Sequence, residues 1–423
     1  MAVTSRPEQP EPFLRGCLFP PIGSVLYPRA DPVDADHLPA DVWAAAELPV
    51  GMRLEMVGDA TAVDIAYHTA TANLGYRGEG AGCTFAAYRA ARKISEVEAV
   101  LGEGVVRLEL PGEASRPAIV YLPEGMVPTV MSVTPVGGSI EPAPRRPRWL
   151  AYGDAITQGW LASAPSMAWP AVAGRQLGLD VCNLGYAGSA RGETFSAAML
   201  ADHQAEAISI AYGVNCWSRI PHTPGLLAEG IRAFLAIVRS GQPATPVVVV
   251  TPIVRPDAED TPNRLGATLA DLRLAMEEAV HECIAAGDTN LYLVGGKTVM
   301  DPVELVDGVH PGDEGHKRLA AAVSRQLSPI VEAMGRAFAE RCSTEMHSPH
   351  GPGREGAPAG SLPPSYAPPA ASYVPPLYAP VPPPAPTPSY APPATPAYTP
   401  PATPAYTPPG QEASTGWEAD LRR

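Results

Sequence analysis

The chain has 423 residues, of which 45% are hydrophobic, and its 30 Lys and Arg against 44 Asp and Glu give a formal net charge of −14. This length allows two domains and a tail, and the acidic balance argues against nucleic acid or an anionic membrane as a partner. No apolar run of about 18 residues is present that could form a membrane span. The six cysteines are scattered without a Cys-x-x-Cys pair, and the N-terminus has no basic segment followed by an apolar one. We therefore expect a cytoplasmic protein.

Short β-rich segments separated by Gly, Pro and Asp occupy the first third of the chain, at 52–56, 62–67, 105–110 and 118–122. Their partial alternation of apolar and polar residues predicts a β-sandwich accessory domain over residues 21–144, after an N-terminal leader at 1–20. This domain could bind part of a ligand, or it could only pack against the domain that follows.

Apolar runs then alternate with helical patterns, the runs lying at 148–152, 179–182, 207–211, 246–251 and 290–294. This alternation predicts a parallel sheet with helices on both faces, a flavodoxin-like three-layer α/β fold, over residues 145–342. Cys182 is expected to pack in its core. Ser328 and Pro329 are expected to stop or restart the last helix.

Residues 343–423 are rich in Pro, Ala, Tyr, Ser and Thr, and the sequence ATPAYTPP at 394–401 repeats at 402–409. This composition predicts a disordered Pro-rich tail, because it offers no aliphatic residues for a core. The tail could dock a partner, or it could serve only as a solubilising spacer.

The most informative motif is YGDAITQG at 152–159, where an apolar run meets a turn and then a helical pattern. A side chain at such a turn lies above the carboxyl edge of the sheet, where open α/β folds bind ligands. Three further blocks follow in order: NLGYAG at 183–188, YGVN at 212–215 and DGVHP at 307–311.

These four blocks resemble, over roughly residues 146–330, those of the SGNH (GDSL) esterase and acylhydrolase superfamily. In that family the first block is Gly-Asp-Ser, and the serine attacks the ester carbonyl. Ala155 stands at that nucleophile position, and its methyl group cannot attack. Members with a jelly-roll-like N-terminal module are known, and the arrangement of this chain looks like theirs.

The resemblance also assigns roles to other residues. His310 would be the general base and Asp307 would orient its ring. The backbone N–H of Gly188 and the side-chain amide of Asn215 would form the oxyanion hole. Gly153 and Asp154 would support the turn, and Asp154 could simply cap the next helix.

Several neighbouring residues allow more than one interpretation. Trp160, Tyr186 and Trp217 adjoin the blocks and could form an apolar or sugar-stacking wall, or they could be core aromatics. Thr157 and Ser189 are nearby hydroxyls, but neither occupies the turn, so neither is expected to replace the nucleophile.

No phosphate loop, dinucleotide fingerprint or cluster of metal ligands is found in the sequence, which predicts no cofactor and no metal. His316 is interpreted as a residue at the start of a helix rather than a second catalytic group.

Two classes of function fit these observations. One is an esterase or acylhydrolase for a small-molecule, glycan or lipid ester, which works through an acyl-enzyme and is impaired by Ala155. The other is a natural pseudoenzyme that binds such a ligand in the retained cleft. A third reading is that His310 and Asp307 activate water directly in the space left by the missing hydroxyl.

Overall fold

A computed structural model describes residues 6–75 and 82–346 of the chain, and its side chains as far as residue 332. These residues belong to one compact unit, Met1–Gly351. The predicted tail lies outside the described residues except for its first few positions, as do the first five residues of the predicted leader.

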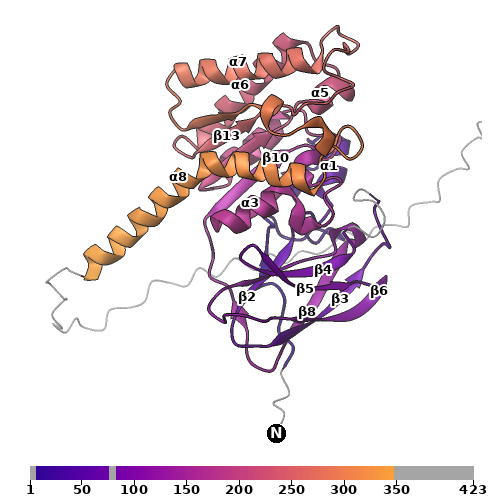
Figure 1. Ribbon diagram of the computed structural model, residues 1–423, viewed down its shortest axis with the longest axis vertical. Helices are drawn as coiled ribbons and strands as arrows, with labels where there is room; N and C mark the ends of the chain where they lie inside the picture. The colour runs from indigo at the N-terminus through magenta and orange to yellow at the C-terminus, as the bar shows by residue number, and fades with distance from the viewer. Residues whose placement is uncertain (1–5, 76–81, 347–423) are drawn as a thin grey trace, which may run out of the picture. The chain divides into compact units, whose positions relative to one another are not determined.

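Two antiparallel sheets make up the N-terminal part of the chain (Figure 1). The first contains, in spatial order, β1 (Leu14–Arg15), β2 (Arg53–Val57), β7 (Ala118–Tyr121), β4 (Thr84–Arg89) and β5 (Arg92–Glu98), with β9 (Glu141–Pro142) also paired to β2. The second contains β6 (Gly102–Glu109), β3 (Ala62–Thr69) and β8 (Pro128–Val136). Alternate residues of both sheets, such as Leu54, Phe85, Ile65 and Leu108, meet in one core. The predicted antiparallel β structure is confirmed, while its likeness to a jelly roll and its boundaries stay predictions.

The second half of the described chain is built around a five-stranded parallel sheet. Its strands, in spatial order, are β11 (Asp180–Gly185), β10 (Arg148–Gly153), β12 (Ala207–Ala211), β13 (Val247–Val250) and β14 (Leu291–Val294). The first strand in sequence lies second in space, which is the flavodoxin-like order. The predicted α/β fold class is therefore confirmed.

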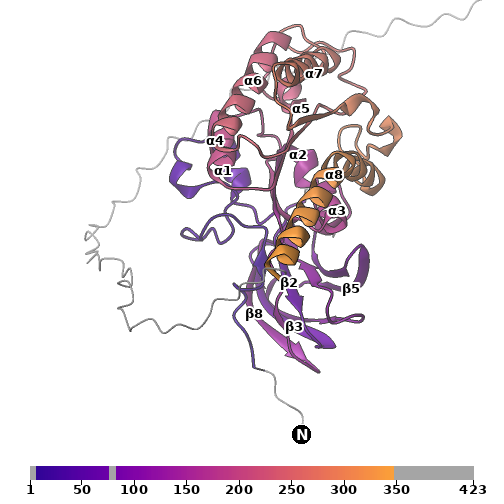
Figure 2. The ribbon, with the colours of Figure 1, turned by 90° about the vertical axis from the view of Figure 1, so that its left-hand side faces the viewer.

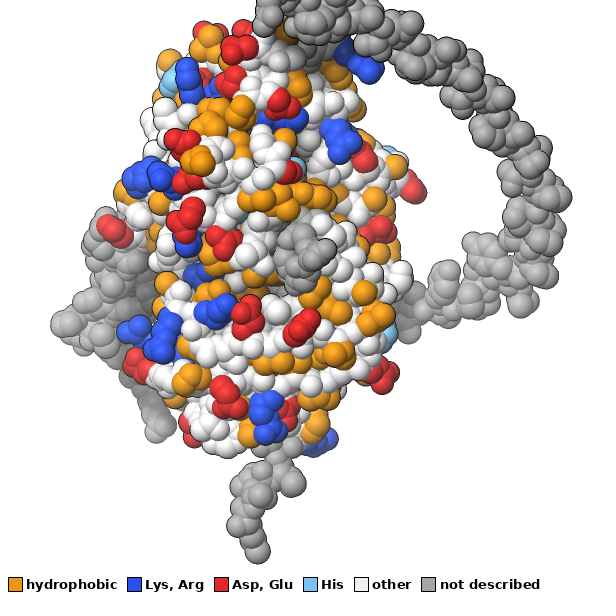
Figure 3. Space-filling view, turned by 45° about the vertical axis from the view of Figure 1, so that its right-hand side comes forward, with side chains coloured by type: hydrophobic (Ala, Val, Ile, Leu, Met, Phe, Trp, Pro, Cys, Tyr) orange, Lys and Arg blue, Asp and Glu red, His pale blue; other side chains and the backbone are white. Residues whose placement is uncertain are grey.

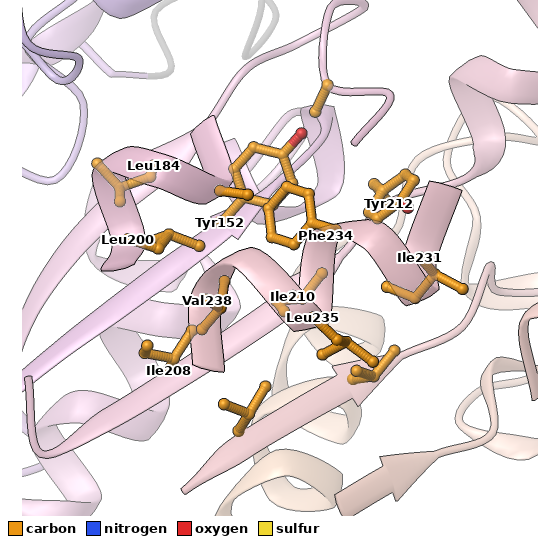
Figure 4. Packing of buried hydrophobic residues seen from close by; sticks show 14 of the residues in the cluster. Tyr152, Leu184, Leu200, Ile208, Ile210, Tyr212, Ile231, Phe234, Leu235 and Val238 are labelled. Atoms are coloured by element: carbon orange, nitrogen blue, oxygen red, sulfur yellow. The ribbon is translucent and has the colours of Figure 1, made fainter. Parts of the chain in front are cut away.

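Helices cover both faces of this sheet (Figure 2). On one face lie α4 (Thr194–Asp202), α6 (Pro224–Gly241) and α7 (Leu269–Ala285), together with α1 (Ala40–Ala46) from the N-terminal part. On the other lie α3 (Trp169–Leu177) and α8 (Asp313–Met346). Figure 4 shows how Phe234 of α6 packs against Tyr152 and Tyr212 at the strand ends. Cys182 is buried in the same cluster, as expected.

The last helix contradicts one prediction. Pro329 lies inside α8, which continues to Met346 instead of stopping or restarting. Proline removes one intrahelical hydrogen bond, but the preceding part of the helix is fixed by packing of buried residues such as Leu319 and Val323 against the sheet. Tertiary contacts therefore outweigh the local signal.

Buried arginines tie the N-terminal part to the parallel sheet. Arg53 donates to Glu55 (Nε to Oε1, 2.7 Å), to the carboxylate of Asp180 and to the carbonyl of Val181 (2.8 Å). Arg29 donates to the carbonyls of two residues at the end of β11, including Gly185. The N-terminal part therefore fixes both ends of β11.

The surface in Figure 3 shows acidic and basic side chains interspersed with apolar ones, without one large patch of a single sign on that face. Among the helices that the structure describes, none combines the length and the apolar character that crossing a membrane requires.

Candidate active site

Strand register brings the first three sequence blocks together. Gly153, at the end of β10, pairs with Gly185 of β11 and with Ala211 of β12. Because these strands are parallel, the chain leaves all three at the same edge of the sheet. That edge, where the strand order reverses, is where doubly wound folds bind ligands.

The first block forms a tight turn into the short helix α2 (Ala155–Gln158). Asp154 is the N-cap, and its Oδ1 accepts a hydrogen bond from the N–H of Ile156 at 3.0 Å. Burial raises the pKa of this carboxyl to about 7, although backbone N–H groups favour its ionised form. Ala155 is the first residue of α2 and is 9% exposed. Asp154 therefore caps the helix, as one interpretation of the sequence proposed, and it also lines the cleft.

The second block forms a loop that α2 holds in place. The N–H of Tyr186 donates to the carbonyl of Gly153 at 2.7 Å, and that of Ala187 donates to Gln158 Oε1 at 2.9 Å. Gly188 has a φ of +73°, a conformation that glycine adopts without strain. Among the described residues, no acceptor takes the N–H of Gly188. This donor is therefore available to a ligand.

The third block opens α5 (Val214–Ser218). Asn215 Nδ2 donates to the carbonyl of Ala190 at 3.1 Å, which fixes the orientation of the carboxamide. An amide nitrogen carries two hydrogens, so one remains for a ligand. Gly188 and Asn215 line the same cleft.

The last block supplies a histidine and its carboxylate from one loop. His310 Nδ1 lies 2.8 Å from Asp307 Oδ2, while Asp307 Oδ1 accepts from the backbone N–H of His310 at 2.7 Å and of Val309 at 3.0 Å. Burial alone would raise the pKa of Asp307, but these hydrogen bonds outweigh it and the pKa is lowered. An ionised Asp307 favours a proton on Nδ1, which leaves Nε2 as the basic nitrogen.

These groups line a cleft of about 440 Å³, a size typical of small-molecule sites. Ala155, Gly188, Asn215 and His310 all contribute to its wall, as does Asp154. Asp307 stands behind His310, and Gly153 lies beneath the turn, buried in β10. The structure thus brings the predicted catalytic and oxyanion residues to one place.

The three predicted wall aromatics have different positions. Trp160 lines the cleft, with its ring centroid 5.8 Å from that of His310. Trp217 lies behind Arg255 and donates from Nε1 to the carbonyl of Thr261. Tyr186 cannot form a substrate wall, because it is fully buried and its hydroxyl donates to the carbonyl of Arg29 at 2.7 Å.

The other polar residues singled out from the sequence lie away from the cleft wall. Thr157 is buried beneath the turn, and Ser189 donates to the carbonyl of Asp41. His316 is buried in the first turn of α8 and accepts from the N–H of Trp169. The structure therefore places none of the three as a substitute nucleophile or base.

Two cationic residues of the cleft were not found from the sequence. Arg219 and Arg255 both line the cleft. Arg219 follows Asn215 by four residues, the spacing that places two side chains on one helix face, so this signal was present. Arg255 comes from a loop after β13, and nothing in the local sequence predicts its position.

Comparison with known proteins agrees with this architecture. Residues 148–328 match the sequence profile of the GDSL-like lipase/acylhydrolase family, in agreement with the resemblance noted in the sequence. No curated protein matches the chain.

Two solved structures share the fold. The salicylyl-acyltransferase SsfX3 from a tetracycline biosynthetic pathway superposes with a TM-score of 0.67 at 22% identity, over 78% of this chain and 98% of its own. A protein described as a GDSL-like lipase from Bacteroides ovatus gives a TM-score of 0.63 at 20% identity, over the same shares of the two chains.

Proposed function

We propose that this chain is an SGNH-type serine esterase or acylhydrolase scaffold for an acyl or acetyl ester, impaired as written because Ala155 occupies the nucleophile position. The observation that carries the proposal is the shared cleft of Ala155, Gly188, Asn215 and His310. The hydrogen bond from His310 to Asp307 completes the set. Together, these groups would meet every requirement of acyl transfer except the attacking atom.

With a serine at residue 155, the reaction would proceed through an acyl-enzyme. The serine Oγ attacks the ester carbonyl while His310 Nε2 takes its proton, and Asp307 stabilises the resulting imidazolium. The N–H of Gly188 and the free amide hydrogen of Asn215 bind the oxyanion. Collapse of this intermediate expels the alcohol, which receives the proton from His310. A water molecule then cleaves the acyl-enzyme by the same steps.

Ala155 itself favours a second candidate, a natural pseudoenzyme that binds an ester, acyl or glycosyl ligand without turnover. The wide cleft is retained without the hydroxyl. A weaker third possibility is that His310 and Asp307 activate water directly in the space left by the missing hydroxyl. An oxyanion hole and substrate binding alone can leave roughly 10³–10⁴-fold catalysis over water, so slow hydrolysis would not identify that mechanism.

The test compares the unaltered chain with Ala155→Ser, called here the serine-restored variant. Short p-nitrophenyl esters report hydrolysis, and a fluorophosphonate probe reports an activated serine. We expect the serine-restored variant to gain at least about a hundredfold in rate and to become labelled. A matched control adds His310→Gln, which should abolish both gains while the protein remains folded.

Each other result has a definite meaning. A folded serine-restored variant that stays inert on acetyl and longer acyl esters would refute the esterase proposal and favour the ligand-binding alternative. Labelling of the unaltered chain at another serine or threonine would show that residue 155 is not the nucleophile position.

A further inference from the structure

Two arginines line the candidate active site, and their charges are compensated differently. Arg255 donates from Nε and Nη2 to the two carboxylate oxygens of Asp257, at 2.8 Å each. Its guanidinium also lies 5.0 Å from the ring centroid of Trp217. Arg255 is therefore a fixed wall residue whose charge is already paired.

Arg219 has no such partner. Its side chain forms no hydrogen bond or ion pair with any residue that the structure describes. The residue is exposed at the end of α5, where its backbone N–H donates to the carbonyl of Asn215 at 2.9 Å. The cleft thus has one paired and one available guanidinium.

The available guanidinium lies beside both candidate oxyanion donors. Arg219 follows Asn215 by one helical turn, so the two side chains share a face of α5. A Cβ added to Gly188 would lie 3.6–3.8 Å from the Arg219 guanidinium atoms. A group bound by Arg219 would therefore be close to an ester carbonyl held by Gly188 and Asn215.

The chemistry of the side chain indicates what it can bind. A guanidinium is a planar fork of N–H donors that matches a carboxylate with two parallel hydrogen bonds. The protein as a whole has a formal net charge of −14, so an unpaired cation in the cleft contributes a positive charge to a protein that is negative overall. Such a cation attracts anionic ligands to the cleft.

We propose that Arg219 binds a carboxylate of the substrate, so that this cleft takes esters with a carboxylate near the ester carbonyl. The carboxylate could belong to the acyl or to the alcohol part of the ester. The identification of the ligand as an ester rests on the proposed function, whereas the ionic contact does not.

The experiment measures binding to the unaltered chain, which contains Ala155 and needs no turnover. In the first pair, monobenzyl glutarate carries a carboxylate on the acyl side of the ester, and benzyl pentanoate is its uncharged counterpart. A second pair, 4-(acetoxymethyl)benzoate and benzyl acetate, places the carboxylate on the alcohol side. Titration calorimetry at low ionic strength gives a Kd for each probe.

In at least one pair, we expect the anionic ester to bind about tenfold more tightly, as a charge-assisted hydrogen-bonded pair provides. Arg219→Met should remove this preference, and added salt should reduce it. Arg92→Met is the matched control, because Arg92 is exposed on β5 and does not line the cleft; it should keep the preference. Equal Kd values in both pairs, or a preference that survives Arg219→Met, would overturn the proposal.

This result is independent of the test of the esterase. An inert serine-restored variant with a clear Arg219-dependent preference would remove the esterase and keep the anion-binding residue. A serine-restored variant that hydrolyses esters, but shows no preference dependent on Arg219, would keep the esterase and remove the anion-binding residue.

Discussion

Asp154→Asn is the substitution that tests most directly how the turn is built. The carboxyl is buried, and burial raises its pKa to about 7. An asparagine has nearly the same size and keeps an oxygen to accept the hydrogen bond from Ile156. The variant therefore removes the ionisation of the side chain while it keeps the helix cap.

The size of the effect follows from proton linkage. The folded pKa of about 7 lies above the unfolded value of about 3.9, so the folded state binds this proton more tightly. This contribution to stability is complete below the unfolded pKa and is lost as the pH rises through 7. Between the unfolded and the folded pKa, the free energy of unfolding falls by about 1.4 kcal/mol for each pH unit. Over the two units from pH 5 to pH 7, the parent should lose about 2.3 kcal/mol that Asp154→Asn does not lose, because the slope falls as the folded carboxyl itself titrates near pH 7.

Urea unfolding of both proteins at pH 5, 6, 7 and 8 measures this difference. We expect the asparagine variant to gain about 2–3 kcal/mol relative to the parent between pH 5 and pH 8. Asp59→Asn is the control, because hydrogen bonds from Ser139 lower the pKa of that exposed carboxyl. The contribution of Asp59 to stability is lost only at acid pH. Above pH 5, the free energy of unfolding of Asp59→Asn should therefore change with pH in parallel with that of the parent. Parallel curves for Asp154→Asn would refute the reasoning, since they would mean that the carboxylate is solvated in the folded state.

Three further substitutions test the supports of the site. Gly185→Ala should lower the free energy of unfolding by about 1–3 kcal/mol or more, because the added Cβ would lie 2.2 Å from a backbone nitrogen of α2. Gly230→Ala is the control, because residue 230 lies inside α6 with open space around it. Its free energy of unfolding in the same urea titration should be equal to that of the parent or slightly higher. Arg53→Met should lower the free energy of unfolding by about 3–5 kcal/mol, since the buried Asp180 loses its ion-pair partner and Glu55 keeps only Arg146. Arg107→Met, which removes an ion pair on the surface, should unfold near the parent midpoint, and equal effects of the two substitutions would contradict the argument. In the serine-restored variant, Asp307→Asn should lower the hydrolysis rate by about 10³–10⁴-fold without loss of fold, as measured with p-nitrophenyl acetate and circular dichroism; an unchanged rate would remove Asp307 from the mechanism.

The parallel sheet could be predicted from the sequence because its strands are continuous apolar runs. Val247–Val250 is one example, buried on both faces between neighbouring strands. Such runs, separated by amphipathic helices, are typical of parallel sheets. The convergence of the first three sequence blocks follows from the same rule, because each lies where a parallel strand ends. The fourth block, at 307–311, comes from the loop before α8 and does not follow from this rule.

Features that depend on contacts distant in sequence could not be predicted in this way. Tyr186 belongs to the second sequence block, yet a hydrogen bond to the carbonyl of Arg29, distant along the chain, fixes its hydroxyl inside the core. Trp217 lies next to Asn215 and Cys216 in sequence, but its ring is covered by Arg255 from another loop. The pairing of Arg53 with Asp180 joins residues 127 positions apart. Nothing in the local composition indicates these partners.

The turn around residue 155 also combines features that do not favour stability. Asp154 is a buried carboxyl whose ionised form is disfavoured by burial. Thr157 has a buried Oγ1 without a hydrogen-bond partner among the described residues, and the N–H of Gly188 donates to none of them. An unpaired buried polar group such as the Thr157 hydroxyl costs about 1–3 kcal/mol, and a fold selected for stability alone would have little reason to combine it with a buried carboxyl. We infer that the cleft is maintained for binding at this position, with or without a nucleophile, because sites of function are where local rules of stability are commonly broken.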